Sequence, residues 1–326
     1  MKLTEKPTKR AARSAEGLET TENPDAAQDP RVAMVLDTDT YNEIDDQFAL
    51  VYAAIAQCLD LKAVYAAPFA NKRSSGPADG MEKSYEEILR VLKFLEYPSD
   101  GLVYRGSTAF MTSAKEPVDS EAARHLIDLA HAVQPPDRLY VVAIGAITNV
   151  ASALLLDPSI KERIAVVWLG GHPPYWEHNW EFNLQQDPYA AQVVFDSEVP
   201  VVHVPCKNVA EHVKTSVPEL KEMLRGTGRI GEYLLQIFTE YVGQDVPRTK
   251  EIWDLAAVAW LVDPESLPSK CMPTPVLNVD DQLSWTHDES RHLYRVLMDA
   301  KRDKIFQKFV SNLRSHVQKS ADTAIE

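Results

Sequence analysis

The chain reads Val35-Leu36-Asp37-Thr38-Asp39-Thr40-Tyr41-Asn42-Glu43-Ile44-Asp45-Asp46-Gln47-Phe48-Ala49-Leu50 between residues 35 and 50, and this stretch decides both its fold and its chemistry. The apolar run 32–36 predicts a buried strand, and residues 47–58 predict the helix that follows it. Four aspartates therefore stand at the carboxyl end of a strand, which is where open α/β sheets bind their ligands.

The four aspartates, Asp37, Asp39, Asp45 and Asp46, repel one another unless a positive charge lies among them. Hard divalent cations such as calcium and magnesium prefer oxygen ligands. In the structural alternative, Asp45 and Asp46 complement the dipole of the helix, and Asp37 and Asp39 shape a loop turn. Because four carboxylates gather within ten residues, the cluster as a whole favours a calcium or magnesium site.

Length and composition indicate a globular protein that acts on small molecules. At 326 residues, the chain can form one large α/β domain or two ordinary ones. A formal net charge of -14 argues against nucleic-acid binding, because phosphate recognition needs a surplus of lysine and arginine. The cysteines, Cys58, Cys206 and Cys271, lack the close spacing of a zinc site, and we expect a reduced, cytoplasmic setting.

Residues 1–30 have no apolar periodicity and are rich in charged and small residues, so we expect a disordered N-terminal tail. They contain no signal-peptide h-region, and no later apolar run approaches the ~20 residues that span a bilayer. The sequence therefore predicts no association with a membrane.

Strands and helices alternate after the first pair. Strands are predicted at 61–67, 139–144, 163–169 and 200–205, and helices at 80–97, 120–133, 148–156 and 188–196. Ser120 is the expected N-cap of the helix at 120–133, and Thr148 or Asn149 that of the helix at 148–156. Strict alternation predicts an α/β fold with a mostly parallel sheet flanked by helices.

The last third of the chain reads as mostly helical from Val217 onward. Helices are predicted at 230–242, 252–262 and 301–317, with a proline-rich interruption before a short strand at 276–279. Because no linker separates two cores, we expect residues 31–326 to form a single α/β domain with a helical C-terminal portion.

Four motifs follow one another along the chain. They are the aspartate turn at residues 37–46, Gly-Ala-Ile-Thr-Asn at residues 145–149, Glu181-Phe182-Asn183 with Asp187-Pro188 after it, and Trp253-Asp254. In this order they resemble the motifs of the nucleoside hydrolase family, the calcium-dependent N-ribohydrolases of the inosine/uridine-preferring type, whose first turn is Asp-x-Asp-Pro-Gly-x-Asp-Asp and whose later strand end is Gly-Pro-Leu-Thr-Asn. The resemblance runs from Arg31 to Val262 and implies a nucleoside hydrolase-like fold with a Rossmann-like core.

This resemblance also implies a metal centre and a reaction. Calcium would be bound by three aspartates and one main-chain carbonyl, which are Asp39, Asp46, Asp254 and Ile144. Asp39 would also be the general base that takes a proton from a calcium-bound water, and Asp37 would orient the ligands from behind. The products would be a free base and ribose, formed through an oxocarbenium-like transition state.

The substrate side of the implied site is made of further polar residues. Asp45, Glu181 and Asn183 would hydrogen-bond the ribose hydroxyls. We also expect Asn71, in the loop after the second strand, to contact the substrate, although an ordinary solvated loop explains it equally well.

Two features depart from the family pattern. The first turn is two residues longer and lacks Pro-Gly, having Tyr41-Asn42-Glu43 instead. Trp253 stands where many members place a histidine that protonates the leaving base. A tryptophan face stacks on a purine, which predicts a preference for purine nucleosides; the alternative is that Trp253 is a core residue of an apolar helix.

The segment 170–180, which follows a predicted strand, is dense in aromatic and histidine residues. We expect it to form a lip that meets the nucleobase, with Tyr175 in contact with the substrate and with His172, His178 or Tyr175 as the replacement acid. The structural alternative for each of these histidines is an ordinary residue of a surface loop.

Two other function classes fit parts of the sequence. A phosphatase of the haloacid dehalogenase type also begins with a strand and Asp-x-Asp, but it does not explain Asp45-Asp46 or Trp253-Asp254. A non-catalytic ribose- or nucleoside-binding protein would keep the metal site and lose the activation of the leaving group. For either enzyme or binder, we expect a homodimer or homotetramer.

Overall fold

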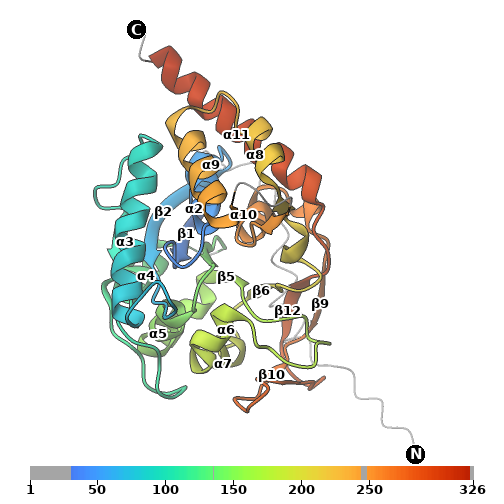
Figure 1. The fold of residues 1–326 in the computed structure, drawn as a ribbon. Coiled ribbons are helices and arrows are strands. Elements are labelled where there is room, and N and C mark those ends of the chain that lie inside the picture. The colour runs from blue at the N-terminus through green and yellow to red at the C-terminus, as the bar shows by residue number, and fades with distance from the viewer. Residues whose placement is uncertain (1–30, 135, 244–247, 324–326) are drawn as a thin grey trace, which may run out of the picture.

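The computed structural model describes residues 31–134, 136–243 and 248–323, which surround one eight-stranded sheet (Figure 1). The tail predicted at 1–30 lies outside the described residues. In spatial order, the strands are β3 (Val103–Arg105), β2 (Leu59–Ala66), β1 (Val32–Thr38), β4 (Leu139–Ala143), β5 (Ile164–Leu169), β6 (Val201–Val204), β12 (Leu293–Leu297) and β9 (Ser269–Pro273). All neighbours pair in parallel except β12 and β9, so the predicted mostly parallel sheet is confirmed.

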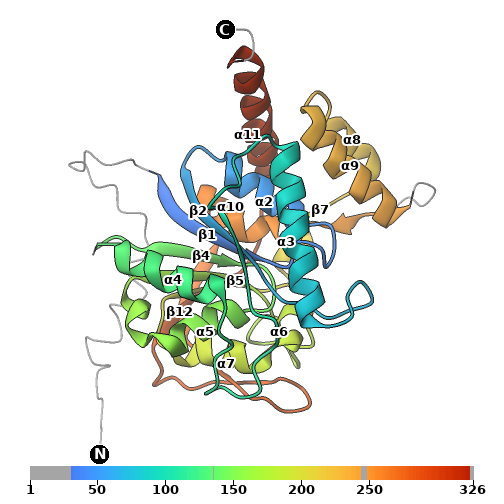
Figure 2. The same cartoon turned by 90° about the vertical axis from the view of Figure 1, so that its left-hand side faces the viewer.

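Helices cover both faces of this sheet (Figure 2). On one face lie α2 (Asp46–Ile55), α3 (Pro77–Phe94), α8 (Val217–Met223), α9 (Gly228–Val242), α10 (Leu255–Val262) and α11 (Arg302–Thr323). The other face is covered by α4 (Glu121–Ala132), α5 (Thr148–Leu156) and α7 (Pro188–Asp196), and the short α6 (Phe182–Gln186) precedes α7. The chain is therefore a three-layer α/β structure.

The central strands are apolar on both sides because each face of the sheet has its own core. In β1, Met34 and Leu36 pack into one core, and Val35 packs into the other. The same alternation holds in β5, where Val167 and Trp168 face opposite cores. Near-continuous apolar runs are the expected sequence of parallel strands that are buried on both faces.

The strand order brings the first aspartate motif to the ligand-binding crevice of the sheet. β1 lies between β2 and β4, and the direction of strand succession reverses at this point. In doubly wound sheets, ligands bind outside the carboxyl ends of the strands at such a reversal. Asp39 follows the end of β1 and Ile144 follows the end of β4, so both stand at the reversal.

One helix has the predicted bounds but not the predicted cap. α5 spans Thr148–Leu156 as expected, yet its N-cap is Ile147, which makes no side-chain cap hydrogen bond. The expected caps are engaged elsewhere, since the Thr148 hydroxyl donates to Asp187 (2.7 Å) and the Asn149 amide donates to Asp37 (2.7 Å). The Ser120 cap of α4 is confirmed, because its hydroxyl accepts from the main-chain N–H of Ala123 (3.1 Å).

The C-terminal third contains more strand than the sequence predicts. β9 and β12 add two strands to the main sheet, and β10 (Val276–Leu277) pairs with β11 (Trp285–Thr286). α10 begins at Leu255 rather than at residue 252, because β8 (Lys250–Glu251) first pairs with β7 (Lys214–Thr215). The last helix, α11, is confirmed and extends beyond the predicted 301–317.

The helix predicted at 80–97 begins earlier, at Pro77, because proline fits the first turn of a helix, where its missing N–H is not needed. All three cysteines are free. Among the described residues, no helix combines the length and the apolar character needed to cross a membrane.

Candidate active site

Three buried aspartates from two segments far apart in the sequence meet beside the end of β1. Asp45 is the N-cap of α2, Asp46 is its first residue, and Asp254 is the N-cap of α10. One carboxylate oxygen of each lies within 4.8 Å of one of the others. α2 packs against α10, so two helix N-termini point their partial positive charge at this group of carboxylates.

Asp39 lies beside this group and has no hydrogen-bond partner. Both of its carboxylate oxygens are buried and unpartnered among the described residues. Gly145 allows the close approach, because a Cβ atom at that position would lie 2.9 Å from Asp39 Cγ. The buried side-chain amide of Asn183 and the indole of Trp253 line the same pocket as Asp39.

The pKa values of these carboxyl groups reflect their burial and their closeness to one another. Burial, together with repulsion from neighbouring aspartates, raises the pKa of Asp39 and Asp254 well above the ordinary value. Burial and repulsion from Asp45 likewise raise the pKa of Asp46 to about 7. The pKa of Asp45 is raised by burial, and the nearby Lys250 ammonium lowers it in part. Each aspartate thus resists carrying its negative charge in this surrounding.

The donor set fits a hard divalent cation. The group supplies several carboxylate oxygens, and the two oxygens of Asp39 accept no hydrogen bond. A bound cation would relieve the repulsion that raises these pKa values, and oxygen donors of this kind are those that calcium takes. Ile144 also lines the pocket, and its main-chain carbonyl accepts from the side-chain amide of Asn183, which lines the pocket too.

Asp37 lies one step behind Asp39 rather than in the pocket. It is fully buried, and its Oδ1 accepts from the Asn149 side-chain amide (2.7 Å). The side-chain oxygen of Asn149, Oδ1, in turn accepts from the main-chain N–H (2.7 Å) and the hydroxyl (2.8 Å) of Ser107. Burial raises the pKa of Asp37 to about 7, and the hydrogen bond from Asn149 opposes that rise.

Asn183 presents an acceptor to the pocket. Its amide nitrogen donates to the carbonyls of Ile144 (3.0 Å) and Leu169 (2.9 Å). Because both N–H groups are used in this way, Oδ1 is the atom left for a ligand, and a carbonyl oxygen accepts from a hydroxyl.

Glu181 is held by main-chain donors at the start of α6. Its carboxylate accepts from the N–H groups of Gly171 (2.6 Å), Asn183 (3.1 Å) and Leu184 (3.1 Å). The buried thiol of Cys206 lies beside the same carboxylate, and burial together with Glu181 raises the thiol pKa well above its usual range. Glu181 is therefore a fixed carboxylate on the pocket wall.

Trp253 and His172 both line the pocket, although they belong to segments that are far apart in the sequence. Trp253 directly precedes the N-cap of α10, and its half-buried side chain both packs against the core and lines the pocket, so the core alternative holds in part. His172 is 6% exposed, and its Nδ1 has no hydrogen-bond partner among the described residues. Burial, with the nearby His178 and Lys207, lowers the pKa of His172 to about 4. Its ring is therefore neutral at pH 7.

The other two residues of the predicted lip lie farther out. His178 stacks on Trp180, with ring centroids 4.7 Å apart, and is 5.7 Å from the His172 ring. Tyr175 is 60% exposed, and its hydroxyl is hydrogen-bonded to the Asn208 amide (3.0 Å). Neither His178 nor Tyr175 is among the residues that line the pocket, whereas Trp180 is.

The remaining lining of the pocket, whose volume is about 370 Å³, includes Asn71, which has a predicted role, and several residues that have none. The Asn71 amide, which was predicted to contact substrate, donates to Asn42 Oδ1 (2.6 Å), and both residues line the pocket with Glu43. Cys206 and Lys207 line it from the loop after β6. Their place after a strand was the only signal that could have pointed to them, since neither belongs to a motif.

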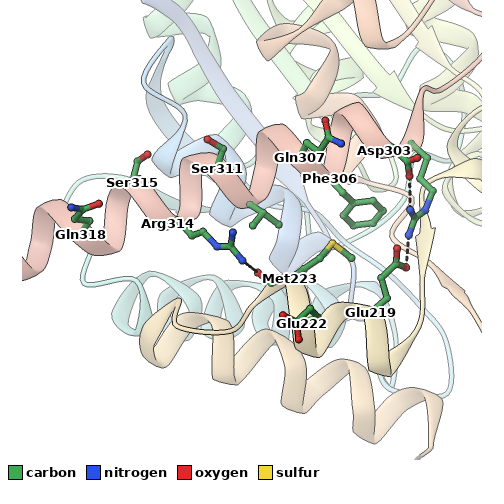
Figure 3. Close-up of a pocket in the computed structure, with 12 residues that line it drawn as sticks. Glu219, Glu222, Met223, Asp303, Phe306, Gln307, Ser311, Arg314, Ser315 and Gln318 are labelled. Carbon is green, nitrogen blue, oxygen red and sulfur yellow. Dashed lines mark hydrogen bonds and ion pairs between the residues drawn. The ribbon is translucent and has the colours of Figure 1, made fainter.

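A larger groove of about 590 Å³ lies between α8 and α11, away from the acidic pocket (Figure 3). Its charges are paired: Arg302 contacts Glu219 and Asp303, and Arg314 donates to the main-chain carbonyl of Met223 (3.2 Å). None of the buried aspartates borders it. The groove is therefore larger than the acidic pocket but lacks a comparable set of catalytic groups.

Solved structures of nucleoside hydrolases share this fold. A plant nucleoside hydrolase and a purine-preferring ribonucleoside hydrolase from Gardnerella vaginalis each superpose with a TM-score of 0.69 at 19% identity. Each comparison covers 87% of this chain and 99% of the other. The architecture is thus that of the nucleoside hydrolases.

The sequence comparisons agree with this class. The family model of the inosine-uridine preferring nucleoside hydrolases matches residues 34–307. The non-specific ribonucleoside hydrolase RihC of Escherichia coli (strain SMS-3-5 / SECEC) is 28% identical over 258 residues, which are 72% of this chain and 80% of that enzyme. RihC of Shigella flexneri has the same values. The chain belongs to the inosine-uridine preferring nucleoside hydrolase family and is a hydrolase of N-glycosyl compounds.

Proposed function

We propose that the protein hydrolyses the N-glycosidic bond of ribonucleosides with bound calcium and releases the free base and ribose. The observation that carries this proposal is the buried group of Asp39, Asp45, Asp46 and Asp254 at the carboxyl edge of the sheet. The names of the relatives support the substrate class, because RihC is a non-specific ribonucleoside hydrolase. Family membership speaks against both the phosphatase and the non-catalytic binder.

The residues that would hold calcium are Asp39, Asp46, Asp254 and the main-chain carbonyl of Ile144. When bound, calcium supplies a positive charge that lowers the pKa of water and balances the carboxylates. The Thr38 hydroxyl donates to Asp46, which fixes one oxygen of that carboxylate. The hydrogen bond from Asn183 to the Ile144 carbonyl leaves this oxygen a second lone pair.

Asp39 is the proposed general base. Neither of its oxygens accepts a hydrogen bond from a described residue, so one can bind calcium while the other accepts a proton, and its side chain lines the pocket. The attacking water forms the new C–O bond at the anomeric carbon and transfers a proton to Asp39.

Ribose is clamped by the acceptors on the pocket wall. Asp45, Glu181 and the Oδ1 atom of Asn183 accept hydrogen bonds from its hydroxyls, and Asn71 borders the same pocket. As the bond to the base breaks, positive charge develops on the sugar ring. Fixed carboxylates stabilise that charge.

The leaving base would contact the indole of Trp253 and a hydrogen-bond donor, the imidazole of His172. The half-buried Trp253 stacks on the base, which favours a purine because of its larger ring face. The low pKa of His172 leaves few protonated rings at pH 7, so its proposed role is to donate a hydrogen bond from the neutral ring. The residues beyond the pocket, His178 and Tyr175, would meet only the outer edge of a base.

Release of reducing sugar from a panel of nucleosides tests this proposal. Inosine, adenosine, uridine and cytidine are incubated with the full-length protein in calcium and in chelator, beside an Asp46→Asn variant. We expect ribose from the wild-type protein in calcium, a strong loss in chelator and a strong loss in the variant. No release from any nucleoside would contradict the function, and equal release in chelator would contradict the calcium requirement.

A further inference from the structure

The longer first turn forms part of the wall of the acidic pocket. Asn42 and Glu43, which belong to the stretch that replaces the family's Pro-Gly, both line the pocket. The turn is fixed to the loop after β2, since the Arg73 guanidinium donates to the Glu43 main-chain carbonyl (3.1 Å) and lies over the Tyr41 ring (4.3 Å to its centroid). The side chain of Glu43 points to a different neighbour.

That neighbour is Lys250, the first residue of β8. The Lys250 ammonium lies 2.8 Å from Glu43 Oε2, and the two side chains are 13% and 35% exposed. The Tyr241 hydroxyl donates to the other carboxylate oxygen of Glu43 (3.1 Å). Lys250 also donates to the main-chain carbonyl of Glu251 (2.9 Å), and its ammonium is 5.8 Å from the centroid of the Trp253 ring.

This contact joins the two segments that carry the buried aspartates. Glu43 is two residues before Asp45, and Lys250 is four residues before Asp254. Asp45 and Asp254 share a side-chain hydrogen bond only while one of them carries a proton, because ionised carboxylates only accept. An ion pair between their neighbours can hold the segments together while the aspartates repel each other.

We infer that Glu43 and Lys250 are a pair of positioning residues that sets the spacing between the two halves of the cation site and places Trp253 against the base. The inference rests on the proposed function. It explains a polar contact that the rest of the reaction does not require, and it assigns a role to the two-residue lengthening of the turn. We call this contact the Glu43–Lys250 latch.

Removing both charges of the pair tests its role. Glu43→Gln/Lys250→Met leaves the net charge unchanged, so the long-range attraction for calcium is nearly the same, and the local change is loss of the Glu43 contact and of the ammonium beside Asp45. Loss of groups that orient metal ligands typically costs about 10- to 100-fold in metal affinity or activity. We expect calcium affinity, measured by titration calorimetry, to fall by about tenfold, and kcat/KM for a purine nucleoside by about 10- to 100-fold.

Two further variants bracket this result. Tyr241→Phe removes one neutral hydrogen bond to Glu43 and should weaken calcium binding by about two- to tenfold; it remains informative where the double variant fails to fold. The matched control, Lys161→Met/Glu198→Gln, removes another lysine–glutamate pair (3.1 Å) on the surface and should leave both quantities unchanged.

The outcomes separate the latch from the proposed function. Wild-type calcium affinity and kinetics in the double variant and in Tyr241→Phe would overturn the latch and leave the function standing. A lower melting temperature in chelator with unchanged calcium affinity would also overturn it, because the pair would then be merely structural. If the wild-type protein itself binds no calcium, the proposed function fails first.

Discussion

The acidic pocket and the groove between α8 and α11 both contain carboxylates, but these differ in burial and in pairing. In the groove, Glu219 is half-exposed and paired with Arg302. In the pocket, Asp39 is buried, and neither of its oxygens has a hydrogen-bond partner within the part of the chain that the structure describes. Burying a charge is costly unless it is paired, so a folded protein keeps such a group only where something else is to be bound. Unpaired buried charge therefore identifies the site better than volume does.

The same contrast explains why the pocket depends on distant parts of the chain. The groove is bordered by two helices whose charges neutralise each other locally. The pocket gathers groups from the ends of β1, β4, β5 and β6 and from the start of α10. Only the topology of the sheet brings these groups together, and removing a single one should have effects that no groove residue can produce.

The largest difference between the two regions should appear in turnover. Asp39→Asn removes the proposed base and weakens a proposed calcium ligand with little change in volume. We expect kcat for ribose release to fall by about 10²- to 10⁴-fold, the usual contribution of a general base. Glu222→Gln, in the groove, is the matched control and should remain within about twofold of the wild type, as surface substitutions generally do. Equal losses in the two variants would break the comparison.

Calcium should stabilise the folded protein through the pocket and not through the groove. At about 100 times its Kd, a ligand stabilises by ~2.7 kcal/mol, which corresponds to a rise of roughly 4 °C in Tm for a protein of this size, because the unfolding entropy is about 2.1 cal/mol/K per residue. Calorimetry of the wild-type protein in calcium and in chelator measures this shift. Asp254→Asn should abolish most of it, whereas Glu222→Gln should retain it. A shift that survives in Asp254→Asn would place the cation elsewhere.

Within the pocket, the base-binding side should contribute less than the acidic side. Trp253→Ala should lower the rate for purine nucleosides by roughly 5- to 150-fold, because stacking on a base is worth about 1–3 kcal/mol. The loss should be smaller for pyrimidine nucleosides. Equal losses for purines and pyrimidines would contradict the stacking role of Trp253.

A second variant, His172→Ala, tests the donor to the leaving base. Nitrophenyl riboside, whose leaving group departs without protonation, is the control substrate, and this variant should hydrolyse it at nearly the wild-type rate.

The smallest effect concerns the pH dependence of calcium stabilisation. Burial and Asp45 raise the pKa of Asp46 to about 7, so the folded metal-free protein holds a proton that the unfolded chain has released above its ordinary pKa. Its stability therefore falls as the pH rises through that window. Calcium displaces the proton, and for each proton displaced its affinity grows by up to about tenfold per pH unit.

Paired melting curves in calcium and in chelator, at about pH 5.5 and at about pH 7.5, check this effect. The calcium-induced rise in Tm should be larger at the higher pH. Buried His203, whose pKa burial lowers to about 4, acts on both curves of a pair and cancels in their difference. A calcium shift that is the same at both pH values would mean that these carboxyls are already ionised without the metal.

The sequence allowed the core of the fold to be predicted because its signals are local. The apolar run before Asp37 and the helix 188–196 required no knowledge of distant partners, and α7 has the predicted bounds. β12 escaped prediction because Leu293–Leu297 alternates only partly and becomes a strand through pairing with β6 and β9. Long-range pairing of this kind leaves a weak local pattern.

The site divides in the same manner. The aspartates were recognisable because their spacing within a motif is local, and Asp254 because it heads a helix. Cys206, Lys207 and the Glu43–Lys250 latch were not, because each lies in the pocket or beside it only after the strands are ordered. The prediction for Tyr175 failed for the opposite reason. Its place in an aromatic segment predicted contact with the substrate, but its side chain is exposed and does not line the pocket.

A crystal structure of the protein grown with calcium tests the central claim most directly. The account predicts one ion per chain in the acidic pocket, identified by anomalous scattering, with oxygens of Asp39, Asp46, Asp254 and the Ile144 carbonyl at about 2.3–2.6 Å, the usual calcium–oxygen distance. No ion in the pocket at saturating calcium, or an ion bound in the groove between α8 and α11 instead, would contradict it.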